Sequence, residues 1–283
     1  MNLTSQAFRR WENKRITLLG MSGVGKTTLA SLLPRDQWFH YSGDYRIGTR
    51  YLDEAIIDQV KIMAMKHPYL RKQLRNDSIY IRNNISIENL GPVSDFLGKI
   101  GNPDLDGLSV DEFKRRQRLF RDAEVGAMRD VDDFITRAQT VYGYPHFIND
   151  AGGSIYGLSD AECWDRLSAS TLVLYLRADH DMEETLLDRA CKHPKPLNYE
   201  EAFLDDQLLE YLKINDLSSA EAVVPDEFVQ WIFPRLLAWR KPQYQRIADK
   251  YGHTANASDI AGLRDEVDFT EYVCAAIDAT SGD

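Results

Sequence analysis

The chain has 283 residues, of which 43% are apolar and 28% charged, a balance typical of globular domains and unlike that of disordered or collagen-like chains. Its 44 acidic and 34 basic side chains leave a formal charge of −10, which opposes general binding to nucleic acid or anionic lipid. No apolar run is long enough to span a bilayer, the N-terminus has no leader-like pattern, and the three cysteines have no metal-site spacing. We therefore expect a cytoplasmic protein that has no membrane partner and is not a general nucleic-acid binder, and the oligomeric state stays open.

Short β-branched and apolar runs alternate with helical patterns along the chain. Because helical patterns separate the predicted strands, we expect a parallel sheet with right-handed crossovers and helices on its faces. The first strand ends at Gly20 and is followed by a helix-compatible pattern over residues 27–33. The predicted strands are residues 15–19, 38–41, 146–149, 171–176 and 251–254.

Two stretches interrupt this alternation. Residues 49–112 are polar and mixed in charge, with a turn-rich passage at 91–107, and we expect them to form a largely helical insertion on the substrate side. Residues 191–225 contain two closely spaced prolines and several acidic residues, which favours an irregular lid. The whole chain, residues 1–283, is interpreted as a single domain that carries both additions.

The segment Gly20-Met21-Ser22-Gly23-Val24-Gly25-Lys26-Thr27 matches the pattern G-x-x-x-x-G-K-[ST] and lies between a predicted strand and a predicted helix. Glycines let main-chain N–H groups approach phosphate oxygens, and the start of the helix adds its positive end. Lys26 can neutralise the β- and γ-phosphates, and the Thr27 hydroxyl can ligate Mg²⁺. The pattern predicts ATP and Mg²⁺ as cofactors, with the nucleotide held by Gly20, Ser22, Gly23, Val24, Gly25, Lys26, Thr27 and Thr28.

Two aspartates follow predicted strands. Asp44 comes after the second strand, where a carboxylate can orient an acceptor hydroxyl and take its proton. Asp150 ends the third strand and is a candidate to hold Mg²⁺ through water. Each has a structural alternative: Asp44 can cap the next helix and Asp150 can cap a loop.

The phosphate loop and the segment Tyr41-Ser42-Gly43-Asp44-Tyr45-Arg46-Ile47 together resemble the opening of shikimate kinases and related small-molecule kinases. The resemblance implies that Asp44 contacts the acceptor hydroxyl. It also shows a departure, because Ser42 stands where that family has a first acidic residue that helps to hold Mg²⁺.

Two later segments are similar to the same family. Phe120-Arg121-Asp122-Ala123-Glu124 resembles its Phe-Arg-x-x-Glu segment, which implies that Arg121 grips a substrate carboxylate and that Glu124 supports this site. The structural alternative is a salt pair between Arg121 and Glu124 on a solvated helix face. Gly152 and Gly153 follow the third strand and match two positions of the family's glycine triplet, where bare backbone lies against substrate.

The second half of the chain continues the resemblance. Leu186-Leu187-Asp188-Arg189 and then Lys195-Pro196-Leu197 resemble the family's lid, which implies that Arg189 lies near adenine and that Lys195 reaches the transferring phosphate. Arg240-Lys241-Pro242-Gln243-Tyr244 resembles its Arg-x-Pro-x-Tyr helix, which implies that Arg240 is a second substrate contact. A carboxylate partner at the core edge is the alternative for Arg240.

These patterns predict an α/β P-loop fold of three layers with a parallel five-stranded sheet. They also predict a kinase that moves the γ-phosphoryl group of ATP to a hydroxyl of a small anionic metabolite. Two other functions stay open: a polynucleotide, tRNA or protein kinase on the same core, and a nucleotide-dependent switch without a small acceptor. The densest basic run, Lys114-Arg115-Arg116-Gln117-Arg118, is expected on a solvated helix face.

Overall fold

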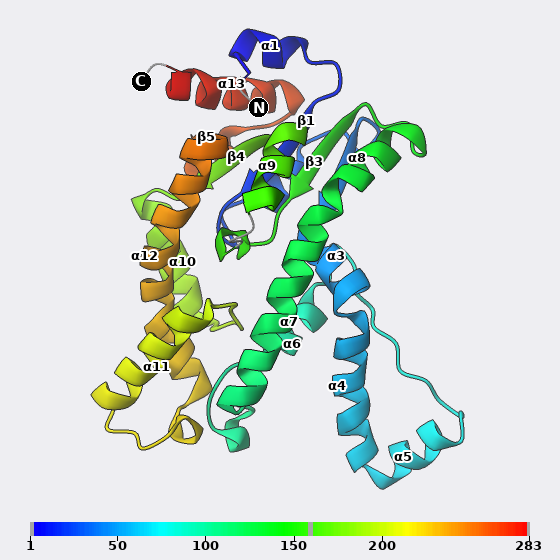
Figure 1. Ribbon diagram of the computed structural model, residues 1–283, viewed down its shortest axis with the longest axis vertical. Coiled ribbons are helices and arrows are strands. Elements are labelled where there is room, and N and C mark those ends of the chain that lie inside the picture. Colours follow the sequence, from blue (N-terminus) through cyan, green and yellow to red (C-terminus); the bar gives the residue numbers. More distant parts are fainter. Residues whose placement is uncertain (1–2, 158–160, 282–283) are drawn as a thin grey trace. The chain divides into compact units, whose positions relative to one another are not determined.

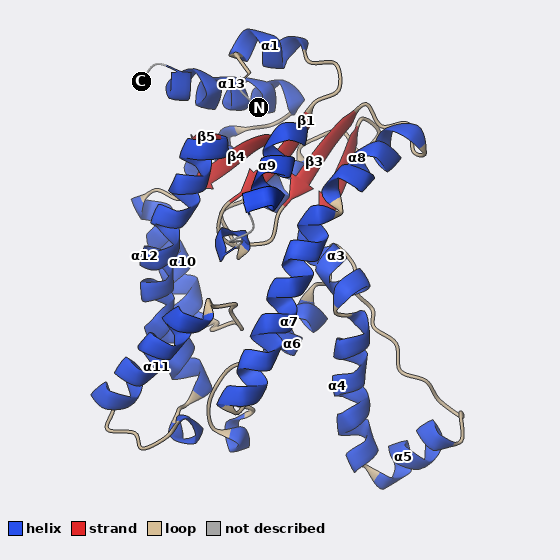
Figure 2. Cartoon of the chain, in the orientation of Figure 1, coloured by secondary structure: helices blue, strands red, loops and turns tan. Residues whose placement is uncertain are grey.

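Five strands form one parallel sheet in the order β2-β3-β1-β4-β5 in the computed structural model, which describes residues 3–157 and 161–281 (Figures 1 and 2). The predicted α/β fold with a parallel five-stranded sheet is confirmed, and each strand lies within two residues of its predicted bounds. The strands are β1 (Arg15–Leu19), β2 (Trp38–Ser42), β3 (His146–Asp150), β4 (Leu172–Arg177) and β5 (Gly252–Asn256).

Helices cover both faces of the sheet, as the alternation of side chains along β2 shows. The Phe39 ring packs at a tilt against the Phe134 ring of α8, whereas the neighbouring Trp38 packs edge-on against Phe269 of α13. Because adjacent strand residues point to opposite faces, α8 and α13 lie on opposite sides of the sheet. The helices grouped with the sheet are α1 (Ser5–Arg10), α2 (Lys26–Ser31), α8 (Val131–Thr140), α9 (Ala161–Ser170), α10 (His180–Lys192), most of α12 (Pro225–Tyr251) and α13 (Glu266–Ser281).

The chain divides into two compact units. The first comprises residues 1–43, 127–194 and 230–283 and contains the sheet. The second comprises residues 44–126 and 195–229, so the predicted insertion and most of the predicted lid fall in the same unit. Its elements are α3 (Gly43–Arg46), the π-helical turn Ile47–Tyr51, α4 (Asp53–Lys66), α5 (Pro68–Arg75), α6 (Gly91–Leu97), most of α7 (Val110–Arg129) and α11 (Glu201–Ile214).

The basic run on α7 is solvated in part, because the Arg115 and Arg118 side chains are exposed, and the rest of it packs within the second unit. The Arg116 side chain is buried, donates to the Phe96 carbonyl at 2.8 Å and lies over the Phe96 ring. Lys114 forms an ion pair with Asp205 of α11 at 2.6 Å, and Arg118 pairs with Glu201 at 3.0 Å. Lys114 and Arg118 are therefore neutralised by acidic residues 91 and 83 positions later in the chain, whereas Arg115 and Arg116 pair with Glu112 on the same helix.

The predicted lid is more regular than its prolines suggested. Residues 201–214 form α11, whose first turn is capped by the Glu200 carboxylate accepting from the Phe203 N–H at 2.9 Å. Leu204, Leu208 and Tyr211 are the buried residues of this helix, and their spacing of four and three places them on one face. Among the described residues, no helix is long and apolar enough to cross a membrane.

Glu112 tests the importance of the α7 charge network. Its carboxylate accepts from Arg115 and Arg116, both at 2.7 Å, and these two hydrogen bonds lower the pKa of Glu112 to about 2. Because the pKa is lower in the folded state, the stabilisation is complete above the ordinary value of 4.5 and is lost as the pH falls toward 2. We expect Glu112→Gln to lower the free energy of unfolding by about 1–3 kcal/mol at pH 7, because it leaves the buried Arg116 charge without its carboxylate.

Urea unfolding of both proteins at a series of pH values measures this difference. The difference between the wild type and Glu112→Gln should shrink as the pH is lowered below about 4.5. The exposed neighbour Asp111 provides the control, and Asp111→Asn should change stability by less than about 0.5 kcal/mol. Equal effects of the two substitutions at pH 7 would contradict the assigned role.

Candidate nucleotide site

The phosphate loop joins β1 to α2 and has a backbone that requires glycine. Gly25 is the N-cap of α2 in the left-handed region, with φ of 96°, and Gly20 and Gly23 also have positive φ angles. A Cβ atom on Gly23 would lie 2.9 Å from the Leu186 side chain, and one on Gly25 would lie 3.3 Å from Ile260. The loop is thus packed between α10 and the turn that follows β5.

Lys26 and Thr27 begin α2 and point back toward the loop and the sheet. The Lys26 ammonium is buried and donates to the carbonyls of Gly20 and Met21 at 2.9 and 3.0 Å. The Thr27 hydroxyl donates to Oδ2 of Asp150 at 2.6 Å. The loop, its lysine and the aspartate of β3 therefore form one contiguous group of residues.

The pairing of the strands explains why Asp150 reaches the loop. In the parallel register, Leu18 of β1 lies opposite Asp150, and Asp150 lies opposite Ser42 of β2. Parallel strands end at the same edge of the sheet, so the residue that ends β3 stands beside the residues that follow β1. Asp150 is therefore part of the loop's surroundings, which favours the metal interpretation over a simple loop cap.

His40 is a neighbour of Asp150 that the sequence did not assign. Its Nε2 lies 4.0 Å from Oδ2 of Asp150 and has no hydrogen-bond partner among the described residues. Burial lowers the pKa of His40, and the Asp150 carboxylate opposes this shift only in part. The neutral imidazole therefore prevails at neutral pH. His40 lies opposite Ile148, two residues before Asp150, so the strand register and the two-residue period together could have identified this pair.

The donor set around Thr27 fits Mg²⁺. Mg²⁺ prefers oxygen ligands and in nucleotide enzymes is held by few protein groups, the rest being water and phosphate oxygens. The Thr27 hydroxyl and the Asp150 carboxylate supply such oxygens at the loop. In the described residues no group of three or more His, Cys, Asp or Glu side chains forms a protein-only metal site. Thr27 and Asp150 therefore suit a Mg²⁺ ion that binds together with a nucleotide.

Gly153 connects the phosphate loop to helix α12. A Cβ atom on Gly153 would lie 2.8 Å from the Ser22 backbone nitrogen, so the two backbones are in direct contact. The Gly153 carbonyl accepts from the Tyr244 hydroxyl at 2.5 Å and from Nη1 of Arg240 at 3.2 Å. The predicted glycine segment thus supports the loop, and α12 supports the glycine segment.

Arg240 and Tyr244 are buried where they hold Gly153. Arg240 is 4% exposed and lies over the Tyr156 ring at 4.3 Å, while Tyr244 is fully buried and stacks on Tyr175 of β4. Arg240 thus donates to a backbone carbonyl and packs on an aromatic ring, and its predicted substrate contact stays a prediction. Tyr244 belongs to the Arg-x-Pro-x-Tyr segment at residues 240–244, but nothing in the sequence indicated its contact with Gly153.

The acceptor-side candidates lie at the edge of the first unit and in the second. Gly43, the last residue of the first unit, packs on the Asp150 carbonyl and the Gly152 nitrogen, and Asp44 follows it in the first turn of α3. Glu124 on α7 is only 2% exposed, so its carboxyl is not on a solvated helix face, and Arg121 is half-buried.

The two lid candidates are both exposed. Arg189 lies on α10 in the first unit, near Leu186, whose side chain contacts the phosphate loop. Lys195 is the first residue of the second unit's later segment. The roles predicted for both stay predictions.

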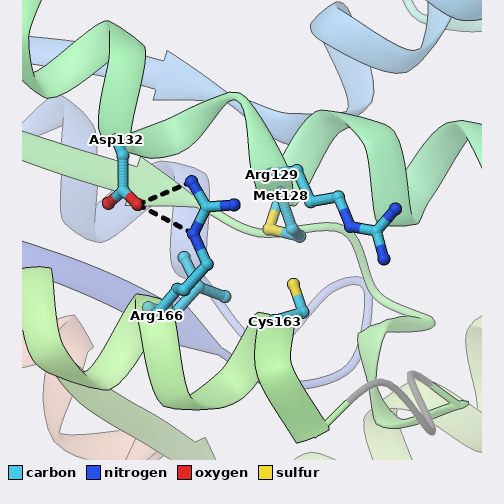
Figure 3. A pocket seen from close by; sticks show the side chains of 6 residues that line it. Met128, Arg129, Asp132, Cys163 and Arg166 are labelled. Carbon is cyan, nitrogen blue, oxygen red and sulfur yellow. Dashed lines mark hydrogen bonds and ion pairs between the residues drawn. The ribbon is translucent and has the colours of Figure 1, made fainter.

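A separate hollow lies between the end of α7, the start of α8 and α9 (Figure 3). It is lined by Met128, Arg129, Asp132, Cys163, Arg166 and Leu167. The Arg166 guanidinium donates to Oδ2 of Asp132 at 3.1 and 3.3 Å across its mouth, as the dashed lines show (Figure 3). None of the predicted site residues lines this hollow, so it is distinct from the phosphate loop.

Comparison with known proteins finds similarity to solved structures. No protein-family model and no curated protein matches the sequence. Among solved structures, a shikimate kinase from Bacteroides thetaiotaomicron is similar over 95% of this chain and 98% of its own, with 14% identity and a TM-score of 0.42. This is the family that the motifs resemble. At such identity, function has to be argued from this chain's own residues.

The contact between Tyr244 and Gly153 can be tested by removing one oxygen atom. Tyr244→Phe keeps the ring stacked on Tyr175 but leaves the Gly153 carbonyl with Arg240 as its remaining donor among the bonds described above. We expect a loss of about 1 kcal/mol in the free energy of unfolding and a roughly 3- to 10-fold weaker affinity for MgADP, because Gly153 supports the Ser22 backbone.

Titration calorimetry with MgADP and urea unfolding measure the two effects separately. Tyr41→Phe is the matched control, since the Tyr41 hydroxyl is buried and donates to the Ala127 carbonyl at 2.6 Å. It should lower stability by a similar amount and leave MgADP affinity unchanged. Unchanged MgADP affinity in Tyr244→Phe would mean that its hydrogen bond serves the fold alone.

Proposed function

We propose that the protein is an ATP-dependent phosphotransferase that moves the γ-phosphoryl group to a hydroxyl of a small anionic metabolite. The observation that carries the proposal is the phosphate loop with its lysine and its Thr27–Asp150 contact at the carboxyl edge of the sheet. This arrangement supports binding of a triphosphate with Mg²⁺.

Each group in the loop has a physical task in this proposal. Main-chain N–H groups from Gly20 to Thr28 surround the phosphates, and the Lys26 ammonium exchanges its bonds to loop carbonyls for phosphate oxygens. Mg²⁺, when bound, would neutralise charge on the phosphates; the Thr27 hydroxyl would ligate it and Asp150 would hold it through water. Arg189 and Lys195 are proposed to add positive charge near the nucleotide.

The acceptor side is proposed from residue chemistry. Asp44 orients the acceptor hydroxyl and takes its proton as the new P–O bond forms, while the bond between the β,γ-bridging oxygen and the γ-phosphorus breaks and ADP leaves. Arg121, supported by Glu124, is proposed to hold a carboxylate or another negative group of the metabolite. Arg240 is proposed to hold the same negative group, and the Gly152 and Gly153 backbone is proposed to lie against the substrate. The burial of Glu124 is consistent with a support role.

Incubation of the protein with MgATP and fractionated metabolite pools tests the reaction class. We expect a compound that gains the mass of one phosphoryl group while ATP becomes ADP, and we expect no gain with Lys26→Ala, because the lysine that faces the phosphates is missing. Mass spectrometry measures both. ATP hydrolysis without any phosphorylated acceptor would instead indicate a nucleotide-dependent switch.

Asp44→Asn tests the acceptor-side assignment once an acceptor is known. The amide cannot accept the proton, so kcat should fall by roughly 100-fold or more, whereas MgADP affinity should stay within about twofold. Steady-state kinetics and calorimetry provide the two readings. Asp36→Asn, at an exposed position before β2, is the control and should have wild-type kcat. Full activity in Asp44→Asn would remove Asp44 from the mechanism.

A further inference from the structure

Residues 59–82 expose most of their apolar side chains to solvent. Of the 17 large apolar side chains that are exposed in the described residues, ten lie between Tyr45 and Ile87. Helix α5 has no buried residue, and α4 buries only Ile56, in its first half. Within residues 59–82 the exposed apolar side chains are Val60, Ile62, Met63, Met65, Tyr69, Ile79 and Tyr80, with Ile62 and Met63 at 58% and 62% exposure.

The same segment has a charge opposite to that of the chain. Residues 59–82 contain six lysines and arginines and one aspartate, so they carry +5, whereas the whole chain carries −10 and the remaining residues therefore carry −15. In the part of the chain that the structure describes, no ion pair neutralises Lys66, Lys72, Arg75 or Arg82. Positive charge and apolar surface thus coincide on one stretch of an otherwise acidic protein.

We propose that residues 59–82 are an interface with a second copy of this chain, in which the segment of each protomer packs on the acidic body of the other. Charge complementarity supports this occupant, because the rest of the chain carries −15 against the segment's +5. Segment-to-segment pairing would place like charges together. A stable interface uses about 20–30 residues from each side, which residues 59–82 can supply.

The direction of the apolar side chains favours a protein over a bilayer. At about 100° per residue, Met65, Ile62 and Met63 point about 140°, 200° and 300° around the α4 axis from Val60. A flat lipid surface buries one face of a helix, whereas a protein surface can close around several faces. The exposed fractions of Ile62 and Met63 are both above one half, and burial of such side chains stabilises association.

The same side chains argue against single-stranded nucleic acid. Phosphates would pair with the lysines and arginines, and bases would stack on Tyr69 and Tyr80. Neither interaction covers the aliphatic side chains of α4. Methionine adapts to irregular protein surfaces, and two of the exposed residues, Met63 and Met65, are methionines.

Sedimentation velocity and light scattering of the full chain test the interface. We expect a reversible dimer of twice the 32.5 kDa chain mass at concentrations of about 1–100 µM. The double variant Ile62→Glu/Met63→Glu should raise the dimer Kd at least about 10-fold, because it buries charge in an apolar contact. Lys66→Glu/Lys72→Glu should also raise it, and the effect should be larger at low salt.

Controls separate this interface from general effects of added charge. Leu209→Glu on α11 and Val267→Glu on α13 alter side chains that are 70% and 69% exposed outside the segment, and each should raise the dimer Kd much less than Ile62→Glu/Met63→Glu does. Circular dichroism checks that each variant is folded. MgADP affinity is read independently, so loss of dimerisation and failure of the proposed kinase function are distinguishable.

Three results would overturn the proposal. One is a wild-type chain that stays monomeric at about 100 µM. Another is a dimer that is weakened equally by the control variants. The third is a monomer that binds phosphatidylserine vesicles or single-stranded RNA through residues 59–82, with binding lost in Lys66→Glu/Lys72→Glu.

Discussion

The hydrogen bond between Thr27 and Asp150 depends on the parallel pairing of β1 and β3. These residues are 123 positions apart in the chain, yet the register brings the end of β3 beside the loop that follows β1, at 2.6 Å. A parallel sheet places such strand ends at one edge whatever the length of the connections. A long connection between the two strands, such as the one that contains residues 49–112, therefore does not disturb the contact between the phosphate loop and its acidic partner.

The loop is held in place by its surroundings as well as by its glycines. Leu186 contacts Gly23, Ile260 contacts Gly25, and Gly153 contacts the Ser22 backbone, so three different segments fix three points of the loop. Tyr244 and Arg240 extend this support into α12. A phosphate site built from main-chain N–H groups has few side chains to adjust, so its precision depends on such packing.

Local patterns were sufficient for the strands, the phosphate loop and α2, because strand runs and the glycine motif are encoded over a few adjacent residues. They were insufficient for α11, where two nearby prolines obscured the helical spacing of Leu204, Leu208 and Tyr211. They were also insufficient for the α7 run, whose neutralising partners Glu201 and Asp205 lie far away in sequence. The hydroxyl of Tyr244 donates to the backbone carbonyl of Gly153. Because every residue has such a carbonyl, the identity of residue 153 gave no indication of this contact.

Net charge describes a sum, whereas binding depends on where the charges lie. The basic run on α7 is the densest cationic cluster in the sequence. Its side chains, however, form ion pairs with acidic residues of the second unit, and Arg116 also donates a hydrogen bond to the Phe96 carbonyl. Residues 59–82 are less dense in charge but keep four cations without ion pairs in the described structure, beside exposed aliphatic side chains. At physiological salt a charge acts over about 8 Å. A partner bound to residues 59–82 therefore interacts more strongly with the charge of +5 on this segment than with the net charge of −10 on the whole chain.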